Sequence, residues 1–451
     1  MAFEKMKIKK ITCIGAGYVG GPTMAVIAQK CPEIKVTVVD SNKKKIEDWN
    51  GPLEDLPVFE PGLSEIINKT RNKNLFFSED VKKAIVESEM IFIAVNTPTK
   101  TTGEGAGMAC DLKYVIKCAE MISKYSKSNK IIVEKSTLPV RTAETIKRVL
   151  DKYSDNIHFE VLSNPEFLAE GTAIQDLYKS DRVLIGSEQT LSGKKAADKL
   201  VSIYEKWIPS EKILRSNVWS SELSKLASNA FLAQRISSIN SLSALCEKTG
   251  ADIDEVSQAI GFDHRIGPYF LKVSPGFGGS CFQKDILNLV YLCRHYGLEE
   301  VADYWHGVVK INDYQRDRIV KTIYNYSTTN KLEKKISILG WAFKKNTNDS
   351  RESSSIYVAF NLLKLNYEIN VYDPRVESER IIYDLILLGV NKSKIKEKIN
   401  IVNSLDKIIS LDYPIAIMTE WEEFFDLEKL SNLKILDFRN ILSKNNVKYR
   451  F

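Results

Sequence analysis

Histidine is scarce in this sequence, and its cysteines lack the spacing of a metal site. The chain of 451 residues contains four histidines, and none of its seven cysteines forms a Cys-x-x-Cys pair. Zinc sites are built from clustered Cys and His ligands, so we expect no metal. An odd number of unpatterned cysteines also argues against a disulfide framework and predicts a reduced, cytoplasmic protein.

Long apolar runs and concentrations of one charge are also missing. No stretch approaches the about 20 apolar residues of a membrane span, and we expect no signal peptide at the N-terminus. Lys and Arg number 64 against 58 Asp and Glu, so the net charge is +6, and lysines occur along the whole chain. We therefore expect neither membrane nor nucleic acid as a partner, while anionic small molecules remain candidates.

The chain is too long for one hydrophobic core, and its hydrophobic pattern changes twice. Short β-rich runs alternate with amphipathic stretches in residues 1–218 and again in residues 329–451, which predicts two doubly wound α/β domains. Residues 219–328 form a predicted helical domain, with a long central helix at 219–249 and a second helix at 299–326. The predicted strands are 8–14, 35–39, 90–95, 131–134, 159–162, 182–185, 335–339, 368–372, 399–402, 415–418 and 434–436.

The first predicted strand runs into Gly15-Ala16-Gly17-Tyr18-Val19-Gly20, followed by a helical pattern. This is the dinucleotide fingerprint of a Rossmann-like domain: the glycines permit a tight turn, close approach of a pyrophosphate and close helix packing. Asp40 ends the next strand, where an acid binds a ribose hydroxyl and repels the extra phosphate of NADP. NAD is therefore the predicted cofactor, although Lys43, Lys44 and Lys45 keep NADP as an alternative.

Polar residues follow two further strands of this predicted sheet. They are Val95-Asn96-Thr97-Pro98-Thr99 and Glu134-Lys135-Ser136-Thr137. Ligands of open α/β sheets bind beyond the carboxyl ends of parallel strands, so both segments are candidates for a nucleotide site. Each alone is equally consistent with a plain turn.

One cysteine differs from the others in its setting. Cys281 follows a glycine-rich loop and precedes a helical run over 286–295. Ser280 with Gln283 matches a capping box, which predicts Ser280 as the N-cap and Cys281 as the first helical residue. The helix dipole and Lys284 would favour a reactive thiolate, and Asp285 would share a face with it. The alternative is a buried thiol that closes a loop.

The predicted long helix carries polar residues at helical spacing. Lys225 and Asn229 are four residues apart and share a face, although Lys225 could equally form a surface ion pair with Glu222. Glu166 and Glu170 follow a strand and are candidate acid–base groups, or ordinary acids at a helix start.

Two dehydrogenase classes are excluded by missing residues. None of the nineteen tyrosines is followed four residues later by lysine, which excludes the short-chain type. Zinc alcohol dehydrogenases are excluded by the lack of clustered cysteines. A nicotinamide cofactor with one activated cysteine suits aldehyde oxidation, in which a thiohemiacetal loses hydride and becomes a thioester.

Eight segments together resemble a known family. They are 15–20, 95–99, 134–140, 164–171, 219–241, 276–285, 340–345 and 351–355. They resemble the UDP-glucose/GDP-mannose dehydrogenase family, and the Ser-Cys-Phe-Gln-Lys-Asp run at Cys281 resembles its eukaryotic members. The resemblance implies an NAD domain, a dimer-building central helix and a C-terminal nucleotide-sugar domain. It also implies oxidation of UDP-glucose to UDP-glucuronate with two NAD⁺, in a homodimer that builds a larger assembly such as a hexamer.

The resemblance assigns roles to residues. Cys281 is the implied nucleophile, Lys225 stabilises the oxyanion with Asn229 and Thr137, and Asp285 and Glu166 act on the hydrolytic water. The implied cofactor contacts are the glycine turn, Asp40, Lys45, residues 95–99, Ser136, Thr137, Glu170, Lys284 and Arg351. The implied substrate contacts are Glu166, Phe167, Leu168, Ala169, Glu170, Lys225, Asn229, Lys272, Phe277, Gly278, Lys344, Arg439 and, from the neighbouring subunit, Arg265.

The sequence departs from the family pattern in two places. The run Asp437-Phe438-Arg439-Asn440 lacks a glycine and a second arginine, and Trp341 replaces a phenylalanine. The alternatives are the same chemistry on GDP-mannose or UDP-N-acetylmannosamine, and a non-catalytic sugar-nucleotide sensor. A sensor predicts loss of Cys281, Lys225 or Asp285, all of which are present, and a two-electron hydroxyacid dehydrogenase has no use for Cys281.

Overall fold

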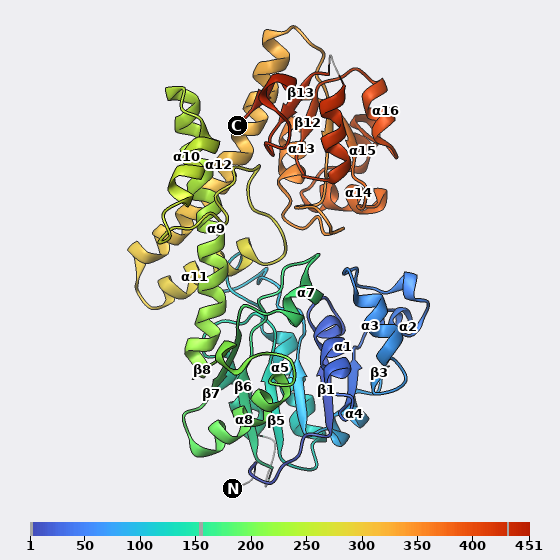
Figure 1. The fold of residues 1–451 in the computed structure, drawn as a ribbon, viewed down its shortest axis with the longest axis vertical. Coiled ribbons are helices and arrows are strands. Elements are labelled where there is room, and N and C mark those ends of the chain that lie inside the picture. The colour runs from blue at the N-terminus through green and yellow to red at the C-terminus, as the bar shows by residue number, and fades with distance from the viewer. Residues whose placement is uncertain (1–2, 153–156, 431–432) are drawn as a thin grey trace. The chain divides into compact units, whose positions relative to one another are not determined.

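The structure, a computed structural model, describes residues 3–152, 157–430 and 433–451. The chain divides into two units, Met1–Ser228 and Asn229–Phe451, and the 32-residue helix α9 (Val218–Thr249) runs through the point of division (Figure 1). The three-domain division at residues 218 and 328 stays a prediction. Among the described residues, no helix is long and apolar enough to cross a membrane.

The first unit contains an eight-stranded sheet in the order β3-β2-β1-β4-β5-β6-β7-β8. β6 and β7 pair antiparallel, and the other neighbouring pairs are parallel. The order of the first six strands is that of doubly wound dinucleotide-binding sheets, as predicted. The strands are β1 Lys10–Ile14, β2 Lys35–Val39, β3 Leu75–Ser78, β4 Met90–Ile93, β5 Lys130–Glu134, β6 Phe159–Ser163, β7 Val183–Ser187 and β8 Ile213–Asn217.

Helices cover both faces of this sheet, and each face has its own apolar core. The alternation of a strand explains the division: Ile11 and Cys13 join one core, and Ile14 joins the other. The helices are α1 Gly20–Lys30, α2 Lys43–Asn50, α3 Leu63–Thr70, α4 Val81–Glu87, α5 Lys113–Tyr125, α6 Thr142–Lys152, α7 Ala173–Tyr178 and α8 Leu191–Tyr204, with 3-10 turns η1 Leu53–Asp55 and η2 Ser210–Lys212.

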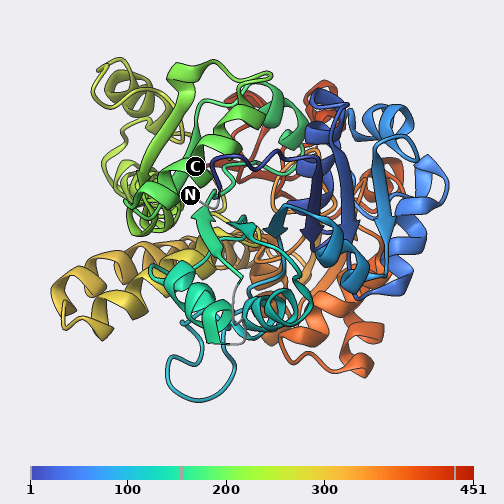
Figure 2. The ribbon, with the colours of Figure 1, turned by 90° about the horizontal axis from the view of Figure 1, so that it is seen from below.

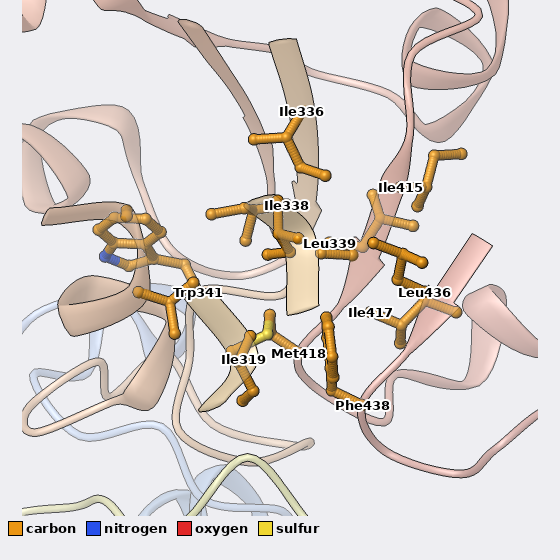
Figure 3. Close-up of a cluster of buried hydrophobic side chains, with 14 of the residues drawn as sticks. Ile319, Ile336, Ile338, Leu339, Trp341, Ile415, Ile417, Met418, Leu436 and Phe438 are labelled. Atoms are coloured by element: carbon orange, nitrogen blue, oxygen red, sulfur yellow. The ribbon is translucent and has the colours of Figure 1, made fainter. Parts of the chain in front are cut away.

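The second unit contains a parallel six-stranded sheet in the order β11-β10-β9-β12-β13-β14. Its strands are β9 Lys335–Leu339, β10 Glu368–Tyr372, β11 Ile399–Ile401, β12 Ile415–Ile417, β13 Ile435–Asp437 and β14 Tyr449–Arg450. Isoleucines and leucines of the central strands pack with Trp341 and Phe438 in one core (Figure 3). Burial on both faces is typical of parallel sheets and explains these continuous apolar runs.

Helices of the second unit form its remaining layers. α11 and α12 pack against each other, and both views show them side by side (Figures 1 and 2). Ile319, Val320 and Ile323 of α12 also join the core of the six-stranded sheet. The helices are α10 Ile253–Gly261, α11 Phe282–His295, α12 Glu299–Thr329, α13 Ser354–Lys364, α14 Ser378–Leu387, α15 Lys392–Lys398 and α16 Leu405–Ser410, with 3-10 turns η3 Glu422–Lys429 and η4 Lys444–Asn446.

Candidate active site

The glycine turn between β1 and α1 has the geometry that its spacing predicts. Gly15 has φ +114°, and a Cβ there would lie 2.2 Å from the carbonyl oxygen of Ala94. A Cβ at Gly20 would lie 2.0 Å from the oxygen of Gly15, whereas a Cβ at Gly17 would meet no atom within 4 Å. The turn is therefore packed from behind and open at Gly17, which is the arrangement that admits a pyrophosphate.

Asp40 ties the end of β2 to this turn. Its carboxylate accepts hydrogen bonds from the N–H groups of Ala16 (3.0 Å) and Asn42 (2.9 Å), and the Lys45 ammonium lies 3.2 Å away. Burial alone would raise the pKa of Asp40, but these hydrogen bonds and Lys45 hold it below its usual range. The group is therefore ionised at neutral pH at the position predicted for a ribose contact.

The two segments after β4 and β5 are joined at the carboxyl edge of the sheet. The Thr97 hydroxyl donates to the carbonyl oxygen of Thr137 (3.1 Å), and the Ser136 hydroxyl donates to that of Val95 (2.7 Å). β4 and β5 are parallel neighbours, so their ends meet at one edge. The structure thus brings together these two predicted nucleotide-facing segments.

Glu166 and Lys225 form a buried ion pair in the first unit. Lys225 Nζ lies 3.0 Å from Glu166 Oε1, and the side chains are 4% and 6% exposed. Burial would raise the pKa of Glu166, but Lys225 and the N–H of Leu168 hold it below its usual range. Lys225 also lies 5.4 Å from the ring centre of Phe167. The alternative interpretation, a surface pair of Lys225 with Glu222, is wrong because Glu222 is buried and accepts backbone hydrogen bonds instead.

A second buried lysine lies near this pair, and its role was not predicted. Lys135 Nζ donates to Asn164 Oδ1 (3.1 Å), which also accepts from the Tyr204 hydroxyl (2.7 Å). Burial lowers the pKa of Lys135 to about 8, although the charge of Glu166 opposes the shift. The sequence signal that could have indicated this role is the position of Lys135 directly after a strand, within Glu-Lys-Ser-Thr. A lysine buried at the end of a strand needs a hydrogen-bond partner.

Cys281 lies at the start of α11 in the second unit. The helix begins at Phe282 with Cys281 as its N-cap, so the prediction of Ser280 as the N-cap and Cys281 as the first helical residue is wrong by one position. The Asp285 N–H donates to the Cys281 carbonyl oxygen at 2.8 Å. The thiol is partly exposed, whereas the other cysteines of the chain are buried.

Asn229 and Asp285 meet in the second unit. The Asn229 amide donates to Asp285 Oδ2 at 2.6 Å, and Asp285 is 1% exposed. Lys284 Nζ lies 3.9 Å from the other oxygen of Asp285. A buried carboxyl group requires hydrogen-bond donors, so this contact with Asn229 of α9 fixes the Asp285 side chain one turn after Cys281.

The loop before Cys281 is clamped by helix α12. Asn312 accepts from the N–H of Phe277 (2.8 Å) and donates to its carbonyl oxygen (3.1 Å), which also accepts from Arg316. A Cβ at Gly278 would lie 2.8 Å from the carbonyl oxygen of Glu352, so the loop needs glycine for close approach. Asn312 and Arg316 were missed because they occupy an ordinary amphipathic helix pattern.

The remaining predicted site residues lie in loops and turns of the two units. Arg351 pairs with Asp349 at 2.5 Å and its carbonyl oxygen accepts from Gly279, whereas Arg439 pairs with Glu420. The other positions are Lys272, exposed; Lys344, half-buried beside Phe343; Arg265, exposed and paired with Asp263; and Glu170, Leu168 and Ala169, in the turn before α7.

The open glycine turn and the acid at the end of β2 define a dinucleotide-binding protein of the NAD type. Three domain descriptions of one family match the chain: the NAD-binding domain at residues 9–208, the central domain at 219–314 and the UDP-binding domain at 337–444. The chain belongs to the UDP-glucose/GDP-mannose dehydrogenase family, as the sequence resemblance predicted.

Relatives match along most of the chain. A UDP-glucose 6-dehydrogenase of Drosophila melanogaster is 55% identical over 93% of this chain and 88% of its own length. UDP-glucose 6-dehydrogenase 3 of Oryza sativa subsp. japonica is 51% identical over 96% of this chain and 93% of its own. The solved structure of a UDP-glucose dehydrogenase from the archaeon Pyrobaculum islandicum superposes with a TM-score of 0.85 at 28% identity, covering 99% and 98% of the two chains.

Proposed function

We propose that this protein is a UDP-glucose 6-dehydrogenase, which oxidises the C6 alcohol of UDP-glucose to the carboxylate of UDP-glucuronate. The observation that carries the proposal is a partly exposed cysteine at a helix start, one turn before the buried contact between Asp285 and Asn229. A simple alcohol dehydrogenase has no use for such a cysteine. Relatives of that name at 55% identity support the substrate.

The residues of the first unit fit NAD. The open space at Gly17 would admit the pyrophosphate, Asp40 would accept the ribose hydroxyls, and the segments at 95–99 and 136–137 would line the nicotinamide side. When bound, NAD⁺ supplies the hydride acceptor in both oxidation steps. The carboxylate of Asp40 disfavours the 2′-phosphate of NADP.

The chain's own groups carry the chemistry between the two oxidations. The Cys281 thiolate adds to the C6 aldehyde carbon, and the carbonyl oxygen takes up the charge, which the Lys225 ammonium would stabilise with Asn229 and Thr137. Loss of hydride from this thiohemiacetal leaves a thioester. Water, oriented by Asp285 or Glu166, then adds to the thioester carbon, and the C–S bond breaks to release the acid and regenerate the thiol.

The organisation of the chain is part of the proposal. We assign residues 1–218 to the NAD domain, 219–328 to the dimerisation region and 329–451 to the nucleotide-sugar domain. Lys344 and Arg439 of the nucleotide-sugar domain would bind the UDP moiety, together with Lys272 of the dimerisation region. Large apolar side chains stand exposed on the helical region of the second unit: Phe231, Leu245, Phe262, Tyr269 and Tyr304. Such exposure favours a homodimer, in which Arg265 would reach the partner's substrate, and the free cysteines favour the cytoplasm.

A substrate comparison tests the proposal. Purified protein is assayed for NADH formation with UDP-glucose, UDP-N-acetylmannosamine and GDP-mannose, each with NAD⁺ and with NADP⁺. We expect UDP-glucose with NAD⁺ to give the highest kcat/KM. Cys281→Ser should lower turnover by about 100-fold or more, whereas Cys293→Ser, a buried cysteine of the same helix, should not. A preference for another sugar nucleotide would overturn the substrate, and full activity of Cys281→Ser would overturn the thioester.

A further inference from the structure

The proposed mechanism does not use a buried carboxyl at the end of β5. Glu134 is 2% exposed, and neither of its oxygens receives a hydrogen bond from an N–H or O–H group of the described residues. An ionised carboxylate in such a setting would lack any compensation for lost hydration. Glu134 is therefore protonated, and its proton needs an acceptor.

The acceptor is Glu222 on α9. Burial and the adjacent Glu222 carboxyl raise the pKa of Glu134, and Glu222 is itself 2% exposed. Its Oε2 accepts from the N–H of Arg141 at 2.6 Å, and its Oε1 accepts from that of Ala143 at 2.8 Å. These N–H groups stand at the start of α6, where the helix dipole favours an anion. The two environments thus differ: Glu134 is the donor and Glu222 the charged acceptor.

The two carboxyls contact the two ends of the segment between β5 and α6, which carries predicted site residues. Glu134 ends β5, residues 135–141 come next, and Glu222 binds the far end of that segment through Arg141 and Ala143. Ser136 and Thr137 lie within it. Glu222 is also three residues before Lys225 on the same helix. The pair therefore joins the Thr137 segment to the helix that presents Lys225.

We infer that Glu134 and Glu222 share one proton and act as positioning residues, which fix the Thr137 segment to the start of α9 while Glu222 is ionised. The functional part of this inference rests on the proposed function, because Thr137 and Lys225 take part in that chemistry. The shared proton itself does not depend on it.

The arrangement is sensitive to pH near neutrality. Burial raises the pKa of Glu222 to about 7, although the N–H groups that it accepts from lower this pKa. Burial and the adjacent Glu222 raise the pKa of Glu134 well above its usual range. As pH falls through about 7, Glu222 takes up a proton and its hold on the N–H groups of α6 weakens. Among the charged groups nearby, Arg141 pairs with Glu144 (2.8 Å) and Lys225 pairs with Glu166.

Stability does not explain the pair. Both carboxyls have a pKa above the value in the unfolded chain, so the folded state binds protons that the unfolded state has released between about pH 4 and 7. Over that window the free energy of unfolding falls as pH rises. The ionised form that holds the segment is therefore the less stable one.

Infrared difference spectroscopy of the full-length protein tests the shared proton without substrate. At pH 8 we expect the carbonyl band of a buried protonated carboxyl, absent in Glu134→Gln and retained in Glu222→Gln. A second band should appear in the wild type as pH falls through about 7 and be missing in Glu222→Gln. Absence of the band at pH 8 in the wild type, or its survival in Glu134→Gln, contradicts the inference.

The pH profile of UDP-glucose oxidation tests the positioning role. Glu134→Gln keeps a neutral donor and should retain kcat within about twofold at pH 8, whereas Glu222→Gln should lose about tenfold or more and its acid limb near pH 7. Glu144→Gln on α6 is the matched control and should change neither. An unchanged profile in Glu222→Gln overturns the role. An inactive wild type would refute the proposed function instead, and the infrared result would stand separately.

Discussion

The two sheets of this chain share a strand order and the glycine that follows their first strand. Both place their first six strands in the order 3-2-1-4-5-6, counted within each unit, and the first sheet continues with two more strands. In both, a glycine of positive φ follows the first strand, and its N–H donates at 2.8 Å to the last residue of the second strand: Gly15 to Val39 and Gly340 to Tyr372. An aspartate then accepts from the turn, Asp40 in the first unit and Asp373 in the second.

The two sheets diverge immediately after this glycine. In the first unit the short turn Gly15-Ala16-Gly17-Tyr18-Val19 leads directly into α1 at Gly20, and a Cβ at Gly17 would meet open space. In the second unit the fully buried Trp341 occupies the turn, and α13 begins only at Ser354, after a loop with Lys344 and Arg351. The comparison teaches that the same sheet edge can carry an open glycine turn or a turn closed by a buried side chain, according to the length and bulk of the residues after the shared glycine.

The largest expected effect tests the shared part of the design. Gly15→Ala and Gly340→Ala each place a Cβ within 2.2 or 2.3 Å of neighbouring atoms at positive φ. Each should cost about 3 kcal/mol or more in the free energy of unfolding, measured by urea titration. Gly307→Ala, on the open surface of α12, is the control and should cost nothing. A tolerated Gly340→Ala would show that the second sheet does not need this turn.

The next effect separates binding from stability. Asp40→Asn should weaken NADH binding about tenfold, because the ribose loses a charged acceptor. Asp373→Asn should leave NADH affinity unchanged and lower the free energy of unfolding by about 2 kcal/mol, since Asp373 accepts from Trp341, Ala342 and Trp421. NADH fluorescence titration and urea unfolding measure the two quantities. Equal losses of NADH affinity in the two variants would contradict the proposal that only the first sheet binds NAD.

The smallest expected effect concerns two fully buried tryptophans, one in each unit. Trp341→Phe removes a hydrogen bond to Asp384 (3.0 Å), and Trp49→Phe removes one to the carbonyl oxygen of Ala16 (3.0 Å). Each should cost about 1–2 kcal/mol of stability. Trp49→Phe alone should also weaken NADH binding, because Ala16 belongs to the glycine turn. A loss of NADH affinity in Trp341→Phe would contradict the proposal that NAD binds to the first unit and the nucleotide sugar to the second.

Much of the fold follows from local patterns. The strands at Lys35–Val39, Lys335–Leu339 and Glu368–Tyr372 have the predicted bounds, because buried parallel strands are continuous apolar runs between turn residues. The structure adds Leu75–Ser78, Ile213–Asn217 and Tyr449–Arg450. The first has four residues, the second has three polar residues among its five and the third has two residues, so their pairing with neighbours, rather than their hydrophobic pattern, makes them strands.

The site was predicted less completely than the fold. The glycine turn, Asp40 and the Glu134–Thr137 segment follow from spacing and strand ends. The Glu222 carboxyl could not be predicted, because i,i+3 spacing suggests a pair with Lys225, whereas the buried partner of Lys225 is Glu166, 59 residues earlier in the chain. Asn312 and Arg316, which hold the cysteine loop, were missed for the same reason: their contacts connect distant segments.

The count of NADH formed per UDP-glucose consumed tests the central claim most directly. The account predicts two NADH per sugar nucleotide, with the first oxidation at the alcohol and the second at the Cys281 thiohemiacetal. The count should fall in Cys281→Ser as an aldehyde-level intermediate accumulates on or off the protein. One NADH per UDP-glucose in the wild type, or two at an undiminished rate in Cys281→Ser, would contradict the account.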